Sequence, residues 1–403
     1  MPATDTDTRS LGAQKLAQAQ ELLSECSLDA WLLVVRESTD RPDPNLRFFV
    51  EQEFTWNSYF LVTRERAVAL VATFDAPDLV SSGLFDDVRT YKEGSRASLV
   101  RMLEEADPRS IGINVSQDDP LADGLTAGLR DQIAVTLEGT PFAARLVSAE
   151  RLLALLRGVK LPAERAIIER AVGETELMFD RVARELRIGL KAREVGALFH
   201  KEADRAGVRT AWVRRQCPTV TVGPKSPVGH VAPGDEPIQD GCLVHMDFGI
   251  VRDGYCSDLQ RLYYAAGPKG GDVPEPVLRA YETIVQSIDL AAKALRPGIA
   301  GWEVDQKVRD HLTSRGFPEY AHALGHHLGR AVHDGGGVLG PRWERYGNAP
   351  FEVVQEGSVY TLEPSIHLPA HGLVSLEEDV VVGPHGATFL SRFPQDLPVL
   401  TLR

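Results

Sequence analysis

The sequence predicts an α/β domain at residues 1–158, followed by an α+β domain with a pseudo-twofold internal repeat at residues 159–403. Three observations predict this architecture. Short apolar strands alternate with helices in the first part, and a proline interrupts a long helical stretch just after residue 158. A helix-rich pattern then occurs twice, at 186–207 and 295–316. The length of 403 residues is also more than one domain usually has.

The first domain begins with a helix predicted over residues 11–27, where Leu and Ala follow one stripe after Ser10, a candidate N-cap. Short apolar strands and one further helix are expected next, with the strands at 29–35, 58–63, 67–73 and 110–116 and the helix at 95–107. The charged, proline-bearing loop at 36–49 either frays or covers a site. The alternation indicates an α/β domain.

The boundary between the domains is predicted near residue 158. A helix over 148–160 is followed by Pro162, which ends it and starts a new helix of about 25 residues. Beyond it, the segments 186–207 and 295–316 align at an offset of 109, with Leu, Arg, Gly, Glu, Val and a terminal Gly in common. We interpret them as a duplicated helix-helix-strand unit; chance similarity of two amphipathic helices is the alternative.

The composition excludes several classes of partner. The net charge of −13 argues against a nucleic-acid or anionic-membrane partner, because either partner would need a basic face on the protein. No apolar run approaches the roughly 18 residues of a membrane span, and the first residues have no secretory pattern, so a cytoplasmic protein is expected. The four cysteines have no CxxC spacing and are expected to be reduced core thiols: Cys26, Cys217, Cys242 and Cys256.

The segment 243–262 carries the first signal of chemistry. It reads as two apolar strands joined at Asp253-Gly254, and each strand contains an acid, Asp247 or Asp258, where an aliphatic residue is expected. In a hairpin the two acids lie on the same face, directly or diagonally across the ladder. Converging carboxylates in an apolar setting require a shared proton or a cation. The segment therefore predicts a cation site.

Three further segments contain polar residues with catalytic capacity. Four of the 11 histidines fall close together, at His322, His326, His327 and His333, on a glycine-containing stretch that disfavours a helix. Glu363 ends an apolar strand. The run 377–379 places three acids inside an otherwise central strand, so one of them is expected to face inward. Four carboxylates and one imidazole would suit two divalent cations about 3.5 Å apart.

The order of these residues resembles a known family. Asp247, Asp258 eleven residues later, Gly325-His326, Glu363-Pro364 and then Glu377 resemble the pita-bread metallopeptidases, which include methionine aminopeptidase, Xaa-Pro aminopeptidase and prolidase. The resemblance covers about residues 160–403, and the first 155 residues look like the creatinase/prolidase N-terminal domain. Minimal methionine aminopeptidases lack that domain. The resemblance therefore implies the pita-bread fold and is greatest to Xaa-Pro dipeptidase (prolidase).

The resemblance implies a set of metal ligands: Asp247, Asp258, His326, Glu363 and Glu377, with Asp258 and Glu377 bridging. Two divalent metal ions are expected. A set of oxygen ligands with a single imidazole favours Mn²⁺, with Co²⁺ or Zn²⁺ as alternatives. The four positive charges of the two ions would balance the four carboxylates, and a bridging water would lose a proton readily.

The resemblance also implies roles on the substrate side. Glu363 would act as general base and then as proton donor, while His230 and His333 would stabilise the tetrahedral intermediate after hydroxide attack on the scissile carbonyl. His322 matches a histidine of the proline-specific branch, and His327 takes a variable position that we expect to line the site. His245, two residues before Asp247 on the same strand face, is a candidate for a supporting role.

The implied activity is hydrolysis of Xaa-Pro bonds, with dipeptides as the leading substrates and a homodimer as the implied assembly. A Xaa-Pro aminopeptidase acting on longer peptides is the close alternative. A metal-free enzyme of the creatinase branch and a catalytically silent peptide-binding homologue are further alternatives, which the five intact ligand residues disfavour.

Departures from the family pattern concern the substrate pocket. The proline-specific branch usually has Arg two residues before the last ligand, where this chain has Ser375, and the usual Gly after Glu-Pro is replaced by Ser365. His367 replaces an aromatic residue. The loop 340–348 contains candidates for binding a substrate carboxylate, with ordinary surface residues as the alternative interpretation: Arg342, Arg345 and Tyr346.

Overall fold

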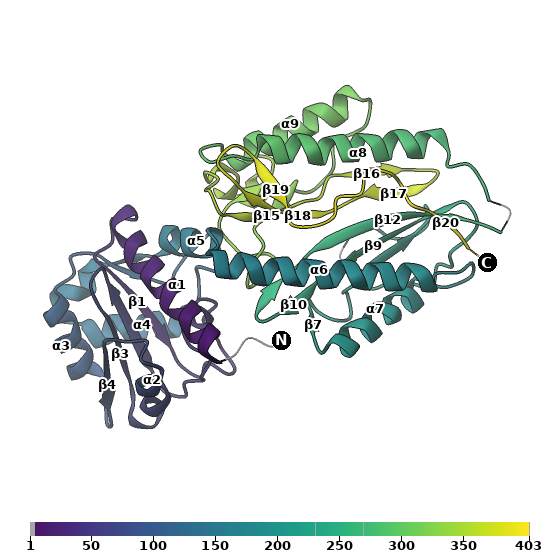
Figure 1. Cartoon of the computed structure of the whole chain (residues 1–403). Helices are drawn as coiled ribbons and strands as arrows, with labels where there is room; N and C mark the ends of the chain where they lie inside the picture. The colour runs from purple at the N-terminus through teal and green to yellow at the C-terminus, as the bar shows by residue number, and fades with distance from the viewer. Residues whose placement is uncertain (1–4, 230, 269, 403) are drawn as a thin grey trace. The chain divides into compact units, whose positions relative to one another are not determined.

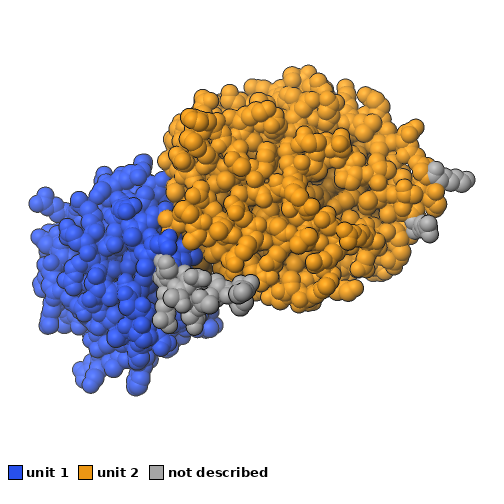
Figure 2. All heavy atoms as spheres, viewed as in Figure 1, with its two compact units in different colours: residues 1–157 blue, residues 158–403 orange. Residues whose placement is uncertain are grey.

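The computed structural model describes residues 5–229, 231–268 and 270–402. The chain divides into two compact units, residues 1–157 and 158–403, which Figure 2 shows in different colours. None of the helices in the described ranges combines the length and the apolar composition that a membrane crossing needs.

The first unit is an α/β sandwich around a six-stranded mixed sheet of order β4-β3-β2-β1-β5-β6. Its helices are α1 (Asp5–Glu25), α2 (Ala76–Ser82), α3 (Arg96–Ala106), α4 (Ala127–Leu137) and α5 (Glu150–Gly158). Its strands are β1 (Ala30–Val35), β2 (Ser58–Thr63), β3 (Ala67–Ala72), β4 (Asp87–Tyr91), β5 (Ile111–Ile113) and β6 (Leu146–Ser148). Alternate residues of the central strand β1 serve opposite faces: Trp31 and Leu33 pack with α1 and α5, while Ala30 and Leu32 pack with α3 and α4.

The predicted α/β architecture of this part is confirmed, although single elements differ and α2, α4 and β6 were not predicted. The first helix begins at Asp5, so Ser10 lies within it and its predicted role as N-cap is wrong. Strand β4 (Asp87–Tyr91) was not predicted, because it is an edge strand with no fully buried residue and therefore no apolar run.

A buried polar network holds the loop at 36–49. Asp43 Oδ1 accepts hydrogen bonds from the backbone and side-chain N–H groups of Asn45, at 2.8 and 3.2 Å, and Asp43 Oδ2 accepts one from Asn114 Nδ2 at 2.8 Å. Trp31 Nε1 donates to the Asn114 oxygen at 2.7 Å. A Cβ at Gly124 would lie 1.8 Å from Asp43 Oδ2, so only glycine fits beside this carboxylate.

In its described residues, the second unit contains four long helices and short strands. The helices are α6 (Pro162–Glu185), α7 (Ala192–Ala206), α8 (Glu275–Ala294) and α9 (Gly301–Ser314). The strands are β7 (Arg209–Thr210), β8 (Thr219–Val222), β9 (Cys242–Phe248), β10 (Ile250–Arg252), β11 (Tyr255–Cys256), β12 (Leu259–Ala266), β13 (Gly325–His326), β14 (Val338–Leu339), β15 (Val359–Leu362), β16 (Ser365–Leu368), β17 (Gly372–Ser375), β18 (Glu378–Val382), β19 (Ala387–Phe389) and β20 (Val399–Thr401).

The strands of this unit lie between two pairs of helices. Figure 1 shows α6 and α7 along one side and α8 and α9 along the other. The largest apolar core packs α8 and α9 against β9, β12 and the strands from β15 to β18. Strands β20-β12-β9-β8 form one sheet, and β15-β18-β19 form another. The site described below lies where these strands approach one another.

The helix pairs repeat each other, as the sequence predicts. Helix α7 begins at Ala192 and α9 begins 109 residues later at Gly301. In both helices the third residue, Glu194 or Glu303, accepts a hydrogen bond from the backbone N–H three positions earlier, at 2.9 Å. The turn before each helix pairs with a later segment in the same way, through Gly189 N–H to Ile238 O and Gly298 N–H to Val354 O.

Candidate metal centre

Strands β9 and β12 bring the first two acids together. They pair antiparallel with Asp247 opposite Gln260, so Asp258, just before β12, lies diagonally from Asp247 on the same face. Between them, β10 and β11 form a tight hairpin through Asp253 and Gly254, whose φ angles of 48° and 81° suit a two-residue turn. A Cβ at residue 249 would lie 2.0 Å from Ser257 O, so only glycine at this position lets the two backbone segments approach so closely.

The imidazole of His326 faces these acids. Its Nδ1 lies 3.1 Å from the carbonyl oxygen of His327, which can only accept, so Nδ1 carries the proton. The lone pair of Nε2 is then directed to Asp258 Oδ2 at 3.9 Å and Glu363 Oε1 at 3.5 Å. Burial lowers the His326 pKa to about 3, which keeps the ring neutral, as a metal ligand must be.

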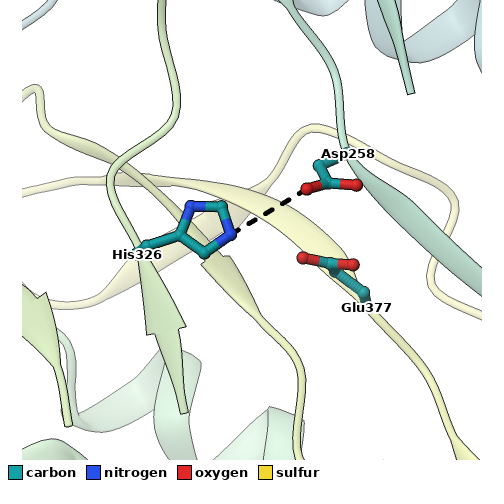
Figure 3. Close-up of side chains that lie close together, drawn as sticks. All are labelled: Asp258, His326 and Glu377. Atoms are coloured by element: carbon teal, nitrogen blue, oxygen red, sulfur yellow. Dashed lines mark ion pairs between the residues drawn. The ribbon is translucent and has the colours of Figure 1, made fainter. Parts of the chain in front are cut away.

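Glu377 completes the cluster from a third segment. Asp258, His326 and Glu377 each offer one ligand atom, and these atoms lie within 4.8 Å of one another (Figure 3). Glu377 and Gln260 exchange two backbone hydrogen bonds of 3.3 Å, which join the last segment to β12. Glu363 follows β15, and its backbone N–H donates to Leu324 O at 2.8 Å, beside the histidine segment.

Three carboxylates of the cluster each have one oxygen without a hydrogen-bond partner in the described part of the chain. Within the described residues, the buried oxygens Asp247 Oδ1, Asp258 Oδ1 and Glu377 Oε1 accept no hydrogen bond. Burial raises the Asp247 pKa to about 7. Burial, followed by repulsion from neighbouring carboxylates, raises the pKa values of Asp258 and Glu377 well above their ordinary range.

Divalent metal ions fit this arrangement of donors. The donors are four carboxylates and one neutral imidazole. Asp258, His326 and Glu377 place ligand atoms within 4.8 Å of one another, Glu363 lies 3.5 Å from His326, and Asp247 lies diagonally from Asp258. Buried acids held this close either stay protonated or coordinate cations, and cations would use the free oxygens. All five predicted ligand residues therefore come from segments that the fold brings to one place.

The remaining histidines occupy different surroundings. His333 is exposed and packs edge-on against His326, with ring centroids 4.3 Å apart. His322 donates from Nδ1 to Ala323 O and accepts at Nε2 from Ser365 Oγ, both at 2.7 Å. His327 is buried and stacks on Tyr360 at 4.0 Å, so its predicted position lining the site is wrong. His230 lies outside the described residues.

The loop at 340–348 presents exposed cationic side chains. Arg342 stacks over the ring of Trp302 at 4.3 Å. Arg345 donates to Ala321 O at 2.7 Å and to the Tyr346 hydroxyl at 3.1 Å. Arg345 therefore contacts the residue before His322, while Arg342 points to α9.

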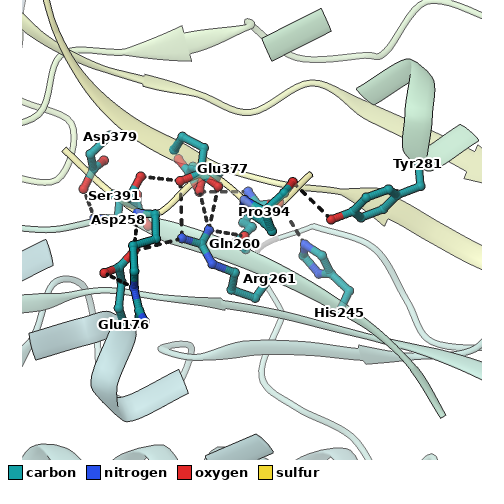
Figure 4. A network of polar contacts seen from close by, with 12 residues as sticks. Glu176, His245, Asp258, Gln260, Arg261, Tyr281, Glu377, Asp379, Ser391 and Pro394 are labelled. Carbon is teal, nitrogen blue, oxygen red and sulfur yellow. Dashed lines mark hydrogen bonds and ion pairs between the residues drawn. The ribbon is translucent and has the colours of Figure 1, made fainter. Parts of the chain in front are cut away.

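Several residues around the ligands were missed by sequence reasoning, and Figure 4 shows their network. All three acids of the 377–379 run are buried, although one was expected to be. Asp379 Oδ2 accepts from the Asp258 backbone N–H at 3.0 Å, and Glu378 pairs with Arg261 at 2.8 Å. The polar pair Gln260-Arg261 inside the apolar strand β12 was the signal that could have revealed this network.

The model of metallopeptidase family M24 matches residues 166–384, more than half of the chain and all the candidate ligands. The chain belongs to this family. As an M24 member it has the predicted pita-bread fold, and the family implies a hydrolase that uses divalent metal.

Individual relatives of this M24 chain agree with the family assignment. The Bacillus subtilis protein YkvY is 32% identical over 260 residues, which are 64% of this chain and 67% of YkvY. The Xaa-Pro dipeptidase of Pyrococcus furiosus is 28% identical over 243 residues, which are 60% of this chain and 65% of the relative. The alignments thus span about two thirds of these proteins.

A solved structure supports the fold of the M24 chain over nearly its whole length. The X-Pro aminopeptidase of Thermotoga maritima matches with a TM-score of 0.70 and 20% identity, covering 96% of this chain and 99% of that structure. At this identity the likeness concerns the fold.

Proposed function

We propose that this M24 chain is a dinuclear-metal peptidase that hydrolyses Xaa-Pro peptide bonds, above all those of dipeptides. The proposal rests on the convergence of Asp258, His326 and Glu377, with Glu363 3.5 Å from His326 and Asp247 diagonally across the strand pair from Asp258. Three buried oxygens of these acids accept no hydrogen bond among the described residues. The relative from Pyrococcus furiosus that bears the name Xaa-Pro dipeptidase supports the choice of substrate.

Two divalent ions, with Mn²⁺ favoured over Co²⁺ or Zn²⁺, would be held by Asp247, Asp258, His326, Glu363 and Glu377. Asp258 and Glu377 are the proposed bridging residues, as the resemblance implies, and they each place a carboxylate oxygen within 4.8 Å of the other and of a His326 nitrogen. Two such ions, when bound, acidify a shared water and polarise a carbonyl oxygen.

Glu363 is the proposed general base and then the proton donor to the leaving amine. Its side chain is 20% exposed, so it borders both the buried acids and the solvent side from which a substrate enters. Burial raises its pKa well above the ordinary range, which suits a carboxyl group that gains and loses a proton in the reaction. His333, on the solvent side of His326, would donate a hydrogen bond to the oxyanion, and His230 is assigned the same role by resemblance.

The proposed substrate-side residues are His322, Arg342, Arg345 and Tyr346. Arg345 is the leading candidate for a substrate carboxylate, because its contact with Ala321 places it next to the segment of His322 and Glu363. An Arg345 guanidinium that binds this carboxylate would favour dipeptides, because in Xaa-Pro the C-terminal carboxylate is that of the proline itself.

Hydrolysis by the chelated protein after addition of Mn²⁺, Co²⁺ or Zn²⁺ tests the proposal. We expect Ala-Pro to be cleaved with Mn²⁺, Ala-Pro-Pro to be cleaved more slowly, and Ala-Ala to be a poor substrate. Cleavage of Ala-Pro-Pro alone would assign the chain to the aminopeptidases. No cleavage of either proline peptide with any of these ions would refute the proposed activity.

A further inference from the structure

We propose that His245 and Gln260, buried on the adjacent strands β9 and β12, form a hydrogen-bonded relay that orients the Glu377 carboxylate for metal binding. The inference rests on the proposed function, because it takes Glu377 as a ligand. It assigns positioning roles to two residues of this chain that do not themselves offer ligand atoms to the cluster.

The relay is continuous and buried. Gln260 Nε2 donates to Glu377 Oε2 at 2.9 Å, and His245 Nε2 lies 2.8 Å from Gln260 Oε1. His245, Gln260 and Glu377 are 3%, 7% and 1% exposed. Figure 4 shows the three side chains in line, on the side of Glu377 away from Asp379.

Chemistry permits only one direction of the relay once Glu377 is ionised. A carboxylate can only accept, so the amide nitrogen of Gln260 must face it and the amide oxygen must face His245. His245 Nε2 must then carry the proton. Rotating the Gln260 amide by half a turn would set its oxygen against the Glu377 carboxylate, so the relay holds one rotamer at each residue.

The relay divides the two oxygens of Glu377 between protein and metal. Oε2 is occupied by Gln260, while Oε1 accepts no hydrogen bond from the described residues and is free to coordinate. The backbones of residues 260 and 377 are already joined by two hydrogen bonds, so the side-chain bond acts on the rotation of the carboxylate. Partners of this kind around a ligand commonly change metal affinity by about 10–100-fold.

His245 is more than a packing residue at this position. Its Nδ1 is buried and accepts no hydrogen bond among the described residues, which costs free energy that an aliphatic side chain would not incur. A strand residue chosen for packing alone would be apolar, as Leu243 and Val244 are. What His245 contributes instead is a hydrogen bond to Gln260 Oε1, which keeps the Gln260 amide from turning.

Titration of the chelated protein with Mn²⁺, followed by electron paramagnetic resonance of the free ion, tests the relay. We expect Gln260→Met to weaken Mn²⁺ binding about 10–100-fold and His245→Leu to weaken it by a smaller factor. His245→Gln retains a donor of similar reach and should restore most of the affinity. The absorption bands of the Co²⁺-loaded protein should shift in Gln260→Met and His245→Leu only.

Tyr281→Phe is the control, because it removes a partly buried hydrogen bond, from Tyr281 to Asp396 O, without touching a ligand. Wild-type Mn²⁺ affinity and Co²⁺ bands in both Gln260→Met and His245→Leu would overturn the proposal. Equal losses of melting temperature with and without metal would also overturn it, since they indicate a merely structural role. If Gln260→Met does not fold, the comparison of His245→Leu with His245→Gln decides by the same titration.

Peptide cleavage is not part of this test. A protein that binds Mn²⁺ through the relay but cleaves no Xaa-Pro peptide would refute the proposed activity and leave the relay intact. A wild-type protein that binds no Mn²⁺ would overturn the ligand assignment of Glu377 and with it the relay.

Discussion

Asp43 in the first unit and Asp258 in the second are both buried carboxylates, yet their surroundings differ. Both oxygens of Asp43 accept hydrogen bonds from Asn45 or Asn114, and the Asn114 amide is itself fixed by Trp31. Asp258 Oδ1 accepts no hydrogen bond among the described residues, and other carboxylates surround it.

The difference separates a closed network from an open one. Amides complete the network around Asp43, so burial of that acid is stabilised by the protein alone. The cluster around Asp258 contains more acceptors than donors, which only protons or cations can balance. Burial of an acid is therefore weak evidence for a metal site, and the presence of oxygens without partners is the stronger evidence.

Removal of metal should abolish activity and loosen only the second unit. We expect chelation to lower peptide hydrolysis by at least about 100-fold, because water is then no longer acidified. Hydrogen exchange should speed up around Asp247, Asp258 and Glu377, since ligand binding stabilises only the structure that binds. Exchange around Asp43 should stay unchanged. Equal acceleration in both units, or full activity after chelation, would contradict the contrast.

Glu363→Gln should separate proton transfer from binding within the open cluster. We expect kcat to fall about 10²–10⁴-fold, because an amide cannot take up or deliver the proton. KM for Ala-Pro should change by less than about 5-fold, since the side chain keeps its shape. Steady-state kinetics on the Mn²⁺-loaded protein measure both. Glu356→Gln, an exposed neighbour in the chain, is the control and should match the wild type; full activity in Glu363→Gln would refute its role.

Local signals account for the parts of the site that could be predicted. The turn at Asp253-Gly254 follows from residues that adopt positive φ, and the alternation of the strand correctly places His245 on the face of Asp247. Spacing along the sequence also places the repeat, because equivalent helices begin 109 residues apart at Ala192 and Gly301.

Long-range pairing accounts for what could not be predicted. The bond from Gln260 to Glu377 joins residues 117 positions apart, and no periodicity within either segment indicates it. Alternation predicts one inward acid in the 377–379 run, but β18 is covered on both faces, so Glu378 and Asp379 are buried as well. Their partners, Arg261 and the backbone of Asp258, come from another strand.

Asp43→Ala should affect stability without affecting metal. The amides of Asn45 and Asn114 would lose their acceptor inside the protein, so we expect the free energy of unfolding of the first unit to fall by about 1–3 kcal/mol. Mn²⁺ affinity should stay at the wild-type value. Urea unfolding and Mn²⁺ titration measure the two quantities. Asp40→Ala, on the exposed part of the same loop, should change stability by less than about 0.5 kcal/mol. A loss of Mn²⁺ affinity in Asp43→Ala would show that the two networks are coupled.

Ser375→Ala should give the smallest effect, because the Ser375 hydroxyl makes one hydrogen bond within the described part of the protein, at the edge of the acidic cluster around Asp258. Its hydroxyl donates to Pro364 O at 3.0 Å and is buried. We expect a loss of about 1 kcal/mol in stability and less than about a 5-fold change in kcat/KM. Ser287→Ala, which also removes a buried serine bond to a carbonyl, to Thr283 O at 2.7 Å in α8, is the matched control. A much larger loss of kcat/KM in Ser375→Ala than in Ser287→Ala would mean that this hydroxyl holds Pro364, and with it the Glu363 carboxylate, in its working position.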